Sequence, residues 1–214
     1  MHFDHRLSVA AIAALVVVCA PVVAQTGNLV PNGRFDFADG VTGWTVVFPD
    51  SSSLTFDGSL DADGCTGSGV ALGTADSIVD GGAAMFTICL GAVSPSDSFH
   101  MSGELRFESS TYPARANLTL GFFDGVDCGG ADLGGGFAGF AVSDVAGWQH
   151  LEAGPVLPAP TVQSAELRVF LTQMVGSDPA IQVQFDEIRV THSDWIFAED
   201  FEVGETCRWS LAPL

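Results

Sequence analysis

The cysteines are the side chains whose chemistry the sequence defines best. Cys65, Cys89, Cys128 and Cys207 follow an N-terminal segment that itself contains Cys19. An even number of cysteines in an exported protein predicts two disulfide bonds, but four cysteines allow three pairings and the sequence does not choose among them. No two of the four lie two to four residues apart, so the spacing of a structural zinc site is missing.

Short catalytic motifs are also missing from the sequence. It contains no G-x-S-x-G, no H-E-x-x-H and no G-x-x-x-x-G-K pattern, and it has no lysine for Schiff-base chemistry. A pair of carboxylates for acid–base catalysis is harder to exclude, because Glu104, Glu108 and Glu166 occupy outward-facing positions of expected strands. With 26 acidic residues some pairs are close by chance, so we predict a protein that is not an enzyme.

The charge balance excludes one class of partner. The chain has 26 acidic and seven basic residues, all seven arginine, and a net charge of −19. Binding of nucleic acid needs clustered cations, so no nucleic-acid partner is expected. Acidity of this kind is most simply explained by solubility outside the cell.

The N-terminus predicts export. Residues 1–24 combine Arg6, an apolar run over Leu7–Val18 and small residues before a cleavage site after Ala24, which is the pattern of a signal peptide. A membrane anchor needs about twenty apolar residues, and this run is shorter and is followed by Pro21. We therefore expect a secreted or cell-surface protein with no transmembrane segment in the mature chain.

The sequence after the signal peptide predicts β-strands. Apolar and polar residues alternate over 98–108, 116–122, 165–171 and 181–190, while Gly, Ser, Asp and Pro clusters interrupt the chain every ten to fifteen residues. About ten strands without crossover helices predict an all-β fold, a two-sheet antiparallel β-sandwich of the jelly-roll type. One domain is expected, over residues 25–192.

The last expected strand changes phase. Its apolar residues occupy odd positions from 181 to 185 but even positions from 188 to 190, so the alternation slips at Asp186 and Glu187. A one-residue slip is what a β-bulge produces. The alternative is that the polar pair simply ends the buried part of the strand.

Two motifs carry a family resemblance. The mature N-terminus reads Asn28-Leu-Val-Pro-Asn-Gly-Arg-Phe-Asp36 and continues to a Gly-Trp pair at Trp44, and the last strand reads Val183-Gln-Phe-Asp-Glu-Ile188. In this order they resemble the opening and closing motifs of carbohydrate-binding modules with the galactose-binding-like jelly-roll fold. The resemblance spans about residues 27–192. It implies a non-catalytic secreted module that binds carbohydrate or a similar extracellular polymer. The alternatives are a structural or adhesive cell-surface protein without a sugar site and, less favoured, a jelly-roll glycanase or polysaccharide lyase.

A glycan-binding role requires aromatic faces for stacking. The expected ligand-binding residues are Tyr112, in a Ser-Ser-Thr-Tyr-Pro turn, and Trp44 and Trp148, each at the start of a strand. Each also has a structural alternative, since both tryptophans suit a core and Tyr112 suits the cover of a sheet edge.

The resemblance also implies a structural calcium ion between the first and last strands. Its ligands would be Asp36 and Asp186, with Asp39 as a substitute because the family usually has the longer glutamate where this chain has Asp36. Calcium prefers six to eight oxygen ligands, and an ion at this place would join distant strands.

The C-terminal segment, residues 193–214, resembles a short FExGxxxxWS motif found at the ends of secreted bacterial proteins. Phe201 and Trp209 are apolar enough to need cover, which favours a terminal strand or turn held by a disulfide at Cys207. The alternative is a tag for sorting to, or anchoring at, the cell surface.

Overall fold

The computed structural model describes residues 27–35, 39–64, 68–75, 83–108, 113–173 and 180–193. The predicted signal peptide, the C-terminal motif, Cys65, Cys207, Tyr112 and Asp36 lie outside these residues. Within them the chain forms strands and no helix, so no helix there is long and apolar enough to cross a membrane. The strands are β1 (Thr45–Val46), β2 (Ser52–Asp57), β3 (Val70–Ala75), β4 (Ala83–Ala92), β5 (Phe99–Phe107), β6 (Ala114–Phe123), β7 (Asp132–Val142), β8 (Gln149–Val156), β9 (Ser164–Gln173) and β10 (Ile181–His192).

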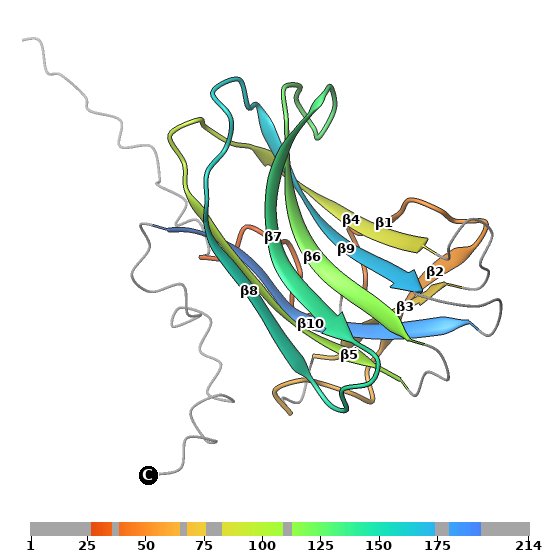
Figure 1. The fold of residues 1–214 in the computed structure, drawn as a ribbon. Coiled ribbons are helices and arrows are strands. Elements are labelled where there is room, and N and C mark those ends of the chain that lie inside the picture. Colours follow the sequence, from red (N-terminus) through yellow and green to blue (C-terminus); the bar gives the residue numbers. More distant parts are fainter. Residues whose placement is uncertain are drawn as a thin grey trace, which may run out of the picture.

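The strands form two five-stranded antiparallel sheets. The β7 sheet has the order β1-β4-β9-β6-β7, and the β8 sheet has the order β2-β3-β10-β5-β8. Figure 1 shows the two sheets packed as layers, with the long strands of the β7 sheet curving so that their hollow side turns away from the β8 sheet. The predicted all-β, two-sheet antiparallel jelly-roll sandwich is confirmed.

The core follows from the alternation that predicted the strands. Odd-numbered residues of β5 are buried and even-numbered ones are at least partly exposed, and the same two-residue period holds in β6 up to Leu120. Leu105 of β5, Leu118 of β6 and Leu167 of β9 have no exposed surface. Burial of one such side chain contributes roughly 1.5–3 kcal/mol, so the facing sheets hold each other through these positions.

The phase slip in the last strand is a β-bulge. The pairing of β10 with β5 shifts between Asp186 and Arg189, and Glu187 has a φ of 51°. The strand does not end there, because Ile188 and Val190 return to the core with no exposed surface. The bulge interpretation is therefore confirmed.

The opening segment lies against the strand that follows this bulge. Leu29 N donates to Val190 O (2.7 Å), Ile188 N donates to Gly33 O (2.8 Å) and Asn28 Nδ2 donates to Ile188 O (2.9 Å). A Cβ atom on Gly33 would lie 2.0 Å from Ile188 O, so only glycine allows this approach. The two motifs of the resemblance are therefore neighbours, joined directly by hydrogen bonds.

Candidate functional site

Exposed aromatic rings gather on the outer side of the β7 sheet. Phe137 and Phe140 of β7 are 49% and 48% exposed. Beside them on β6, Asn117 pairs with Phe140 and Thr119 pairs with Phe137 in the sheet register. Together with Arg115, the preceding outward residue of β6, these residues form what we call the aromatic face.

A bulge puts both phenylalanines on the same side. Residues three apart in a regular strand point to opposite faces, yet Phe137 and Phe140 are both exposed while Ala138 and Ala141 are buried. The β6–β7 register shifts between Asn117 and Thr119, where three residues of β7 span two of β6. Gly139 supplies the extra residue with a φ of 94°, which only glycine adopts at little cost.

The rings and their polar neighbours are arranged for stacking and hydrogen bonding. The ring centroids of Phe137 and Phe140 are 4.9 Å apart with an interplanar angle of 67°. The guanidinium carbon of Arg115 lies 5.1 Å from the centroid of Phe140. Thr119 Oγ1 donates to Asn117 Oδ1 (3.1 Å), which orients the Asn117 amide. Apolar ring faces beside oriented amide and guanidinium donors are the groups that recognise a sugar ring and its hydroxyls.

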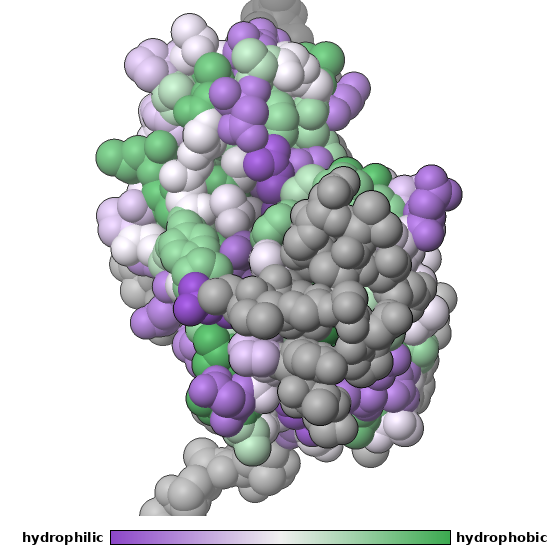
Figure 2. Space-filling view, turned by 45° about the vertical axis from the view of Figure 1, so that its right-hand side comes forward, coloured by the Kyte–Doolittle hydropathy of each residue, from purple (hydrophilic) through white to green (hydrophobic). Residues whose placement is uncertain are grey.

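The face continues onto β9 and becomes more polar. Phe170 lies opposite Asn117, and Arg168 lies opposite Thr119. Arg168 Nε donates to Glu166 Oε1 (2.7 Å), and its Nη1 donates to Asp132 Oδ2 (2.9 Å). Burial lowers the pKa of Arg168, but the bonds and charges of these two carboxylates outweigh burial and raise it, so the guanidinium stays charged and held. Figure 2 shows one side of the molecule, on which hydrophobic areas lie between hydrophilic ones.

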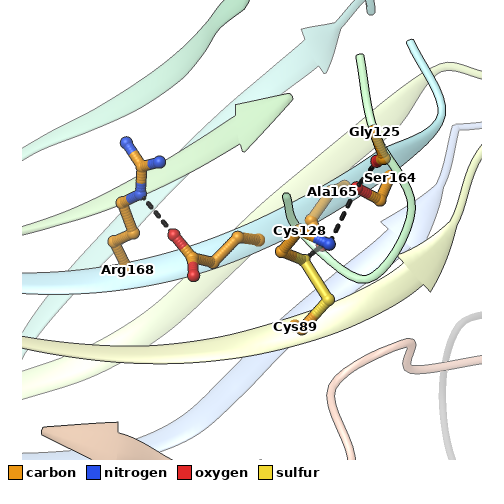
Figure 3. The surroundings of a disulfide bond; sticks show 7 residues. Cys89, Gly125, Cys128, Ser164, Ala165 and Arg168 are labelled. Atoms are coloured by element: carbon orange, nitrogen blue, oxygen red, sulfur yellow. Dashed lines mark hydrogen bonds and ion pairs between the residues drawn. A yellow bond between two sulfur atoms is a disulfide. The ribbon is translucent and has the colours of Figure 1, made fainter. Parts of the chain in front are cut away.

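A disulfide fixes one end of this sheet. Cys89 of β4 is bonded to Cys128 in the loop between β6 and β7, whereas Cys65 and Cys207 lie outside the described residues. Ser164 of β9 holds the same loop, because Cys128 N donates to Ser164 Oγ (3.0 Å) and Ser164 Oγ donates to Gly125 O (2.6 Å). Figure 3 shows Cys128 and Gly125 against Ser164 and Ala165, with Arg168 further along the strand. The loop is thereby tied across β9 to β4.

The tryptophans expected to bind ligand lie elsewhere. The Trp44 ring contacts Phe35 and Phe185 at centroid distances of 5.8 and 5.4 Å, and its buried Nε1 has no hydrogen-bond partner among the described residues. Trp148 lies on the outer side of the β8 sheet, where the guanidinium carbon of Arg106 is 4.9 Å from its ring centroid. Neither tryptophan belongs to the aromatic face. Trp44 packs against core residues, as its structural alternative predicted.

The sequence did not single out the pair that forms this face. In a strand the period of two places Phe137 and Phe140 on opposite sides, so they do not read as one surface. The signal for them was Gly139, because a glycine inside a strand often marks a bulge.

A small polar cavity lies on the outer side of the β8 sheet. Its volume is about 250 Å³, and its lining comprises Asp63, Ser102, Gly103, Glu104, His150, Glu187 and Arg189. His150 Nδ1 lies 2.8 Å from Glu104 Oε1, and Arg189 Nη2 donates to Glu187 Oε2 (2.8 Å). No aromatic ring other than the His150 imidazole lines this cavity, so it offers no surface on which a sugar stacks.

The predicted calcium ligands are only partly described. Asp186 is buried, and its carboxylate accepts N–H bonds from Ala62 (2.9 Å) and Glu187 (2.7 Å), whereas the side chain of Asp39 is exposed. In the described ranges no three His, Cys, Asp or Glu side chains are grouped so that they could hold a metal ion. Asp36, the third expected ligand, lies outside the described residues, so the calcium site stays a prediction.

The three glutamates considered for catalysis do not share one face. Glu104 lies on the outer side of the β8 sheet, next to His150, whereas Glu166 lies on the outer side of the β7 sheet, bonded to Arg168. Glu108 directly follows β5 and accepts a hydrogen bond from a β10 side chain. Because the outer sides of a sandwich point in opposite directions, Glu166 cannot pair with either of the others across one substrate.

Comparison with known proteins supports the fold. No protein-family model and no curated protein sequence matches this chain. Among solved structures, the C-terminal family 22 carbohydrate binding module of Clostridium thermocellum Xyn10B has a TM-score of 0.53 and 16% identity, over 81% of this chain and 98% of that chain. The CBM22-2 xylan-binding domain of Paenibacillus barcinonensis Xyn10C has a TM-score of 0.53 and 12% identity, over 74% and 97%.

A phage protein is also similar in structure. The enzymatically active domain of tailspike protein 4 of bacteriophage CBA120 has a TM-score of 0.52 and 17% identity. That match covers 78% of this chain but 21% of the tailspike chain, so this chain spans about a fifth of its length. At these identities the similarities show a shared fold, the two-sheet jelly roll that the sequence predicted.

Proposed function

We propose that this chain is a non-catalytic extracellular module that binds carbohydrate, or a similar polymer, through the aromatic face of the β7 sheet. The observation that carries the proposal is the pair of exposed rings, Phe137 and Phe140, which the bulge at Gly139 holds on one side of a curved sheet. An exposed aromatic pair on a rigid strand has little structural use, whereas a sugar ring stacks on such a surface.

Two further observations support this function. Solved structures with the same fold include domains described as xylan-binding. The bond between Cys89 and Cys128 is of the kind that persists in oxidising surroundings, which agrees with a protein exported by a signal peptide.

The proposal is tested by affinity electrophoresis of residues 25–214 in gels that contain soluble polysaccharides, including xylan and galactan. A double variant, Phe137→Ala with Phe140→Ala, is expected to lose the retardation that the unchanged protein shows. Both side chains are about half exposed, so the thermal midpoint is expected to stay nearly unchanged.

Phe48→Ala is the matched control. Phe48 is 42% exposed, but it follows β1 at the opposite edge of the β7 sheet, so this variant is expected to bind as the unchanged protein does. Equal loss of binding in the control and in the double variant would contradict the assignment to the aromatic face. No retardation of the unchanged protein by any glycan would favour the structural or adhesive alternative.

A further inference from the structure

Cations are scarce in this protein, and most of those described have anionic or amide partners. Arg34 and Arg189 both bond to one glutamate of the β10 bulge. Arg168 bonds to two carboxylates, and Arg106 donates to a glutamine side chain. Arg115 differs, because within the described part of the chain its guanidinium contacts the Phe140 ring and bonds to no carboxylate or amide.

The position of Arg115 makes this difference informative. It lies on β6, opposite Val142 and Thr172, and its side chain is only partly exposed. Contact with the Phe140 ring keeps the guanidinium beside the aromatic face, and no carboxylate or amide of the described residues uses its N–H groups. A protein with 26 acidic residues thus keeps, beside its exposed rings, an arginine that has no carboxylate partner among the described residues.

We propose that the glycan bound at the aromatic face is acidic, and that Arg115 binds the carboxylate of a uronic acid in it. This inference rests on the proposed function. The sugar ring packs on Phe137 and Phe140, and the carboxylate accepts N–H bonds from Arg115. The planar guanidinium offers two parallel donors that match the two oxygens of a carboxylate.

The net charge of the protein limits how acidic this ligand is. At −19 the protein repels a densely charged polyanion, and at physiological ionic strength this repulsion decays over about 8 Å. A glycan with isolated carboxylates on a mostly neutral backbone avoids most of the repulsion and still satisfies Arg115. The ligand is therefore a polysaccharide with few uronic acid groups rather than a polyuronate.

The test compares one polysaccharide in two forms. Isothermal titration measures the binding of residues 25–214 to a uronic-acid-bearing xylan and to the same xylan after chemical reduction of its carboxyl groups. A hydrogen bond between charged groups predicts about tenfold tighter binding of the acidic form. Arg115→Gln is expected to bring the ratio of the two affinities to about one.

Arg106→Gln is the matched control, since Arg106 also lies over an aromatic ring, but on the other sheet. It is expected to keep the preference for the acidic form. Equal binding of the two forms by the unchanged protein would overturn the inference and leave the proposed function standing. Failure of the protein to bind either form, or any other glycan, would remove both. Equally tight binding of a glycan that carries sulfate groups but no uronic acid would overturn the choice of a carboxylate.

Discussion

Replacing Asp186 with asparagine is expected to remove a loss of stability that the protein otherwise undergoes as the pH rises from 5 to 8. Asp186 is 1% exposed and lies on the outer side of the β8 sheet, under the loop that follows β2. Burial, helped by the charges of Glu187 and Asp61, raises the pKa of its carboxyl group to about 8, although N–H bonds from Ala62 and Glu187 act in the opposite direction.

The sign of the effect follows from the two pKa values. In the unfolded chain the carboxyl group has its ordinary pKa of 3.8, so between pH 3.8 and about 8 the folded state holds a proton that the unfolded state has lost. The free energy of unfolding therefore falls as the pH rises. The contribution of Asp186 is complete below pH 3.8 and is lost by about pH 8. At about 1.4 kcal/mol per pH unit, the loss from pH 5 to pH 8 is at most about 4 kcal/mol.

Urea unfolding at pH 5, 6, 7 and 8 in the presence of a chelator measures this loss. With an m-value of about 2 kcal/mol per molar urea, the midpoint of the unchanged protein is expected to fall by up to about 2 M relative to that of Asp186→Asn. The pH slopes are compared rather than the absolute midpoints, because an asparagine side chain cannot accept both N–H bonds. Asp50→Asn, at an exposed turn, is the control and is expected to keep the slope. Equal slopes for the unchanged protein and Asp186→Asn would refute the reasoning.

Three further predictions concern the calcium site, the disulfide and the β7 bulge. Calcium binding requires the ionised form of Asp186, so calcium is expected to raise the urea midpoint most at pH 8. Calcium is expected to have no effect on the midpoint of Asp186→Ala. No response of the unchanged protein at any pH would contradict the predicted calcium site. Changing Cys89 and Cys128 together to alanine opens a loop with a sequence separation of 39, which is expected to cost at most about 4 kcal/mol in urea unfolding. Gly139→Val forces a positive φ on a branched residue and is expected to cost about 1–3 kcal/mol and to weaken glycan binding. Gly147→Val, at a φ of 86° in a loop, is expected to cost as much while binding is retained.

The fold was readable from the sequence because its strands are amphipathic. In residues 98–108 each apolar side chain that predicted a core position is buried, and the polar ones between them face outward. The phase slip at Glu187 was visible for the same reason, but the sequence alone did not decide between a bulge and the end of the buried part of the strand. The register shift in the structure decides for the bulge. A strand that is buried on one face alternates apolar and polar residues, and this alternation can be recognised in the sequence.

The candidate site was less readable because it lies on the other face. An exposed phenylalanine in a strand has the same sequence pattern as a buried one, so the sequence did not mark Phe137 as a surface residue. The tryptophans were chosen for their residue type, but the packing of Trp44 against Phe185 of β10 depends on how the opening segment folds over the sandwich. Long-range contacts of this kind have no local signal.

The two bulges differ in a way that separates structure from function. At Glu187 a residue other than glycine takes a φ of 51°, which costs of order 1 kcal/mol or more, and its carboxylate is held by Arg34 (3.1 Å) and Arg189 (2.8 Å). The opening segment is hydrogen-bonded to the next residues of the same strand, so this bulge lies where the first and last segments of the domain meet. At Gly139 the conformation needs no such support, and a Cβ atom built there would meet nothing within 4 Å. At Gly139 this bulge therefore leaves its outer side open. The bulge at Gly139 exposes two aromatic rings on one side of a curved sheet. We therefore locate binding at this bulge and not at Glu187.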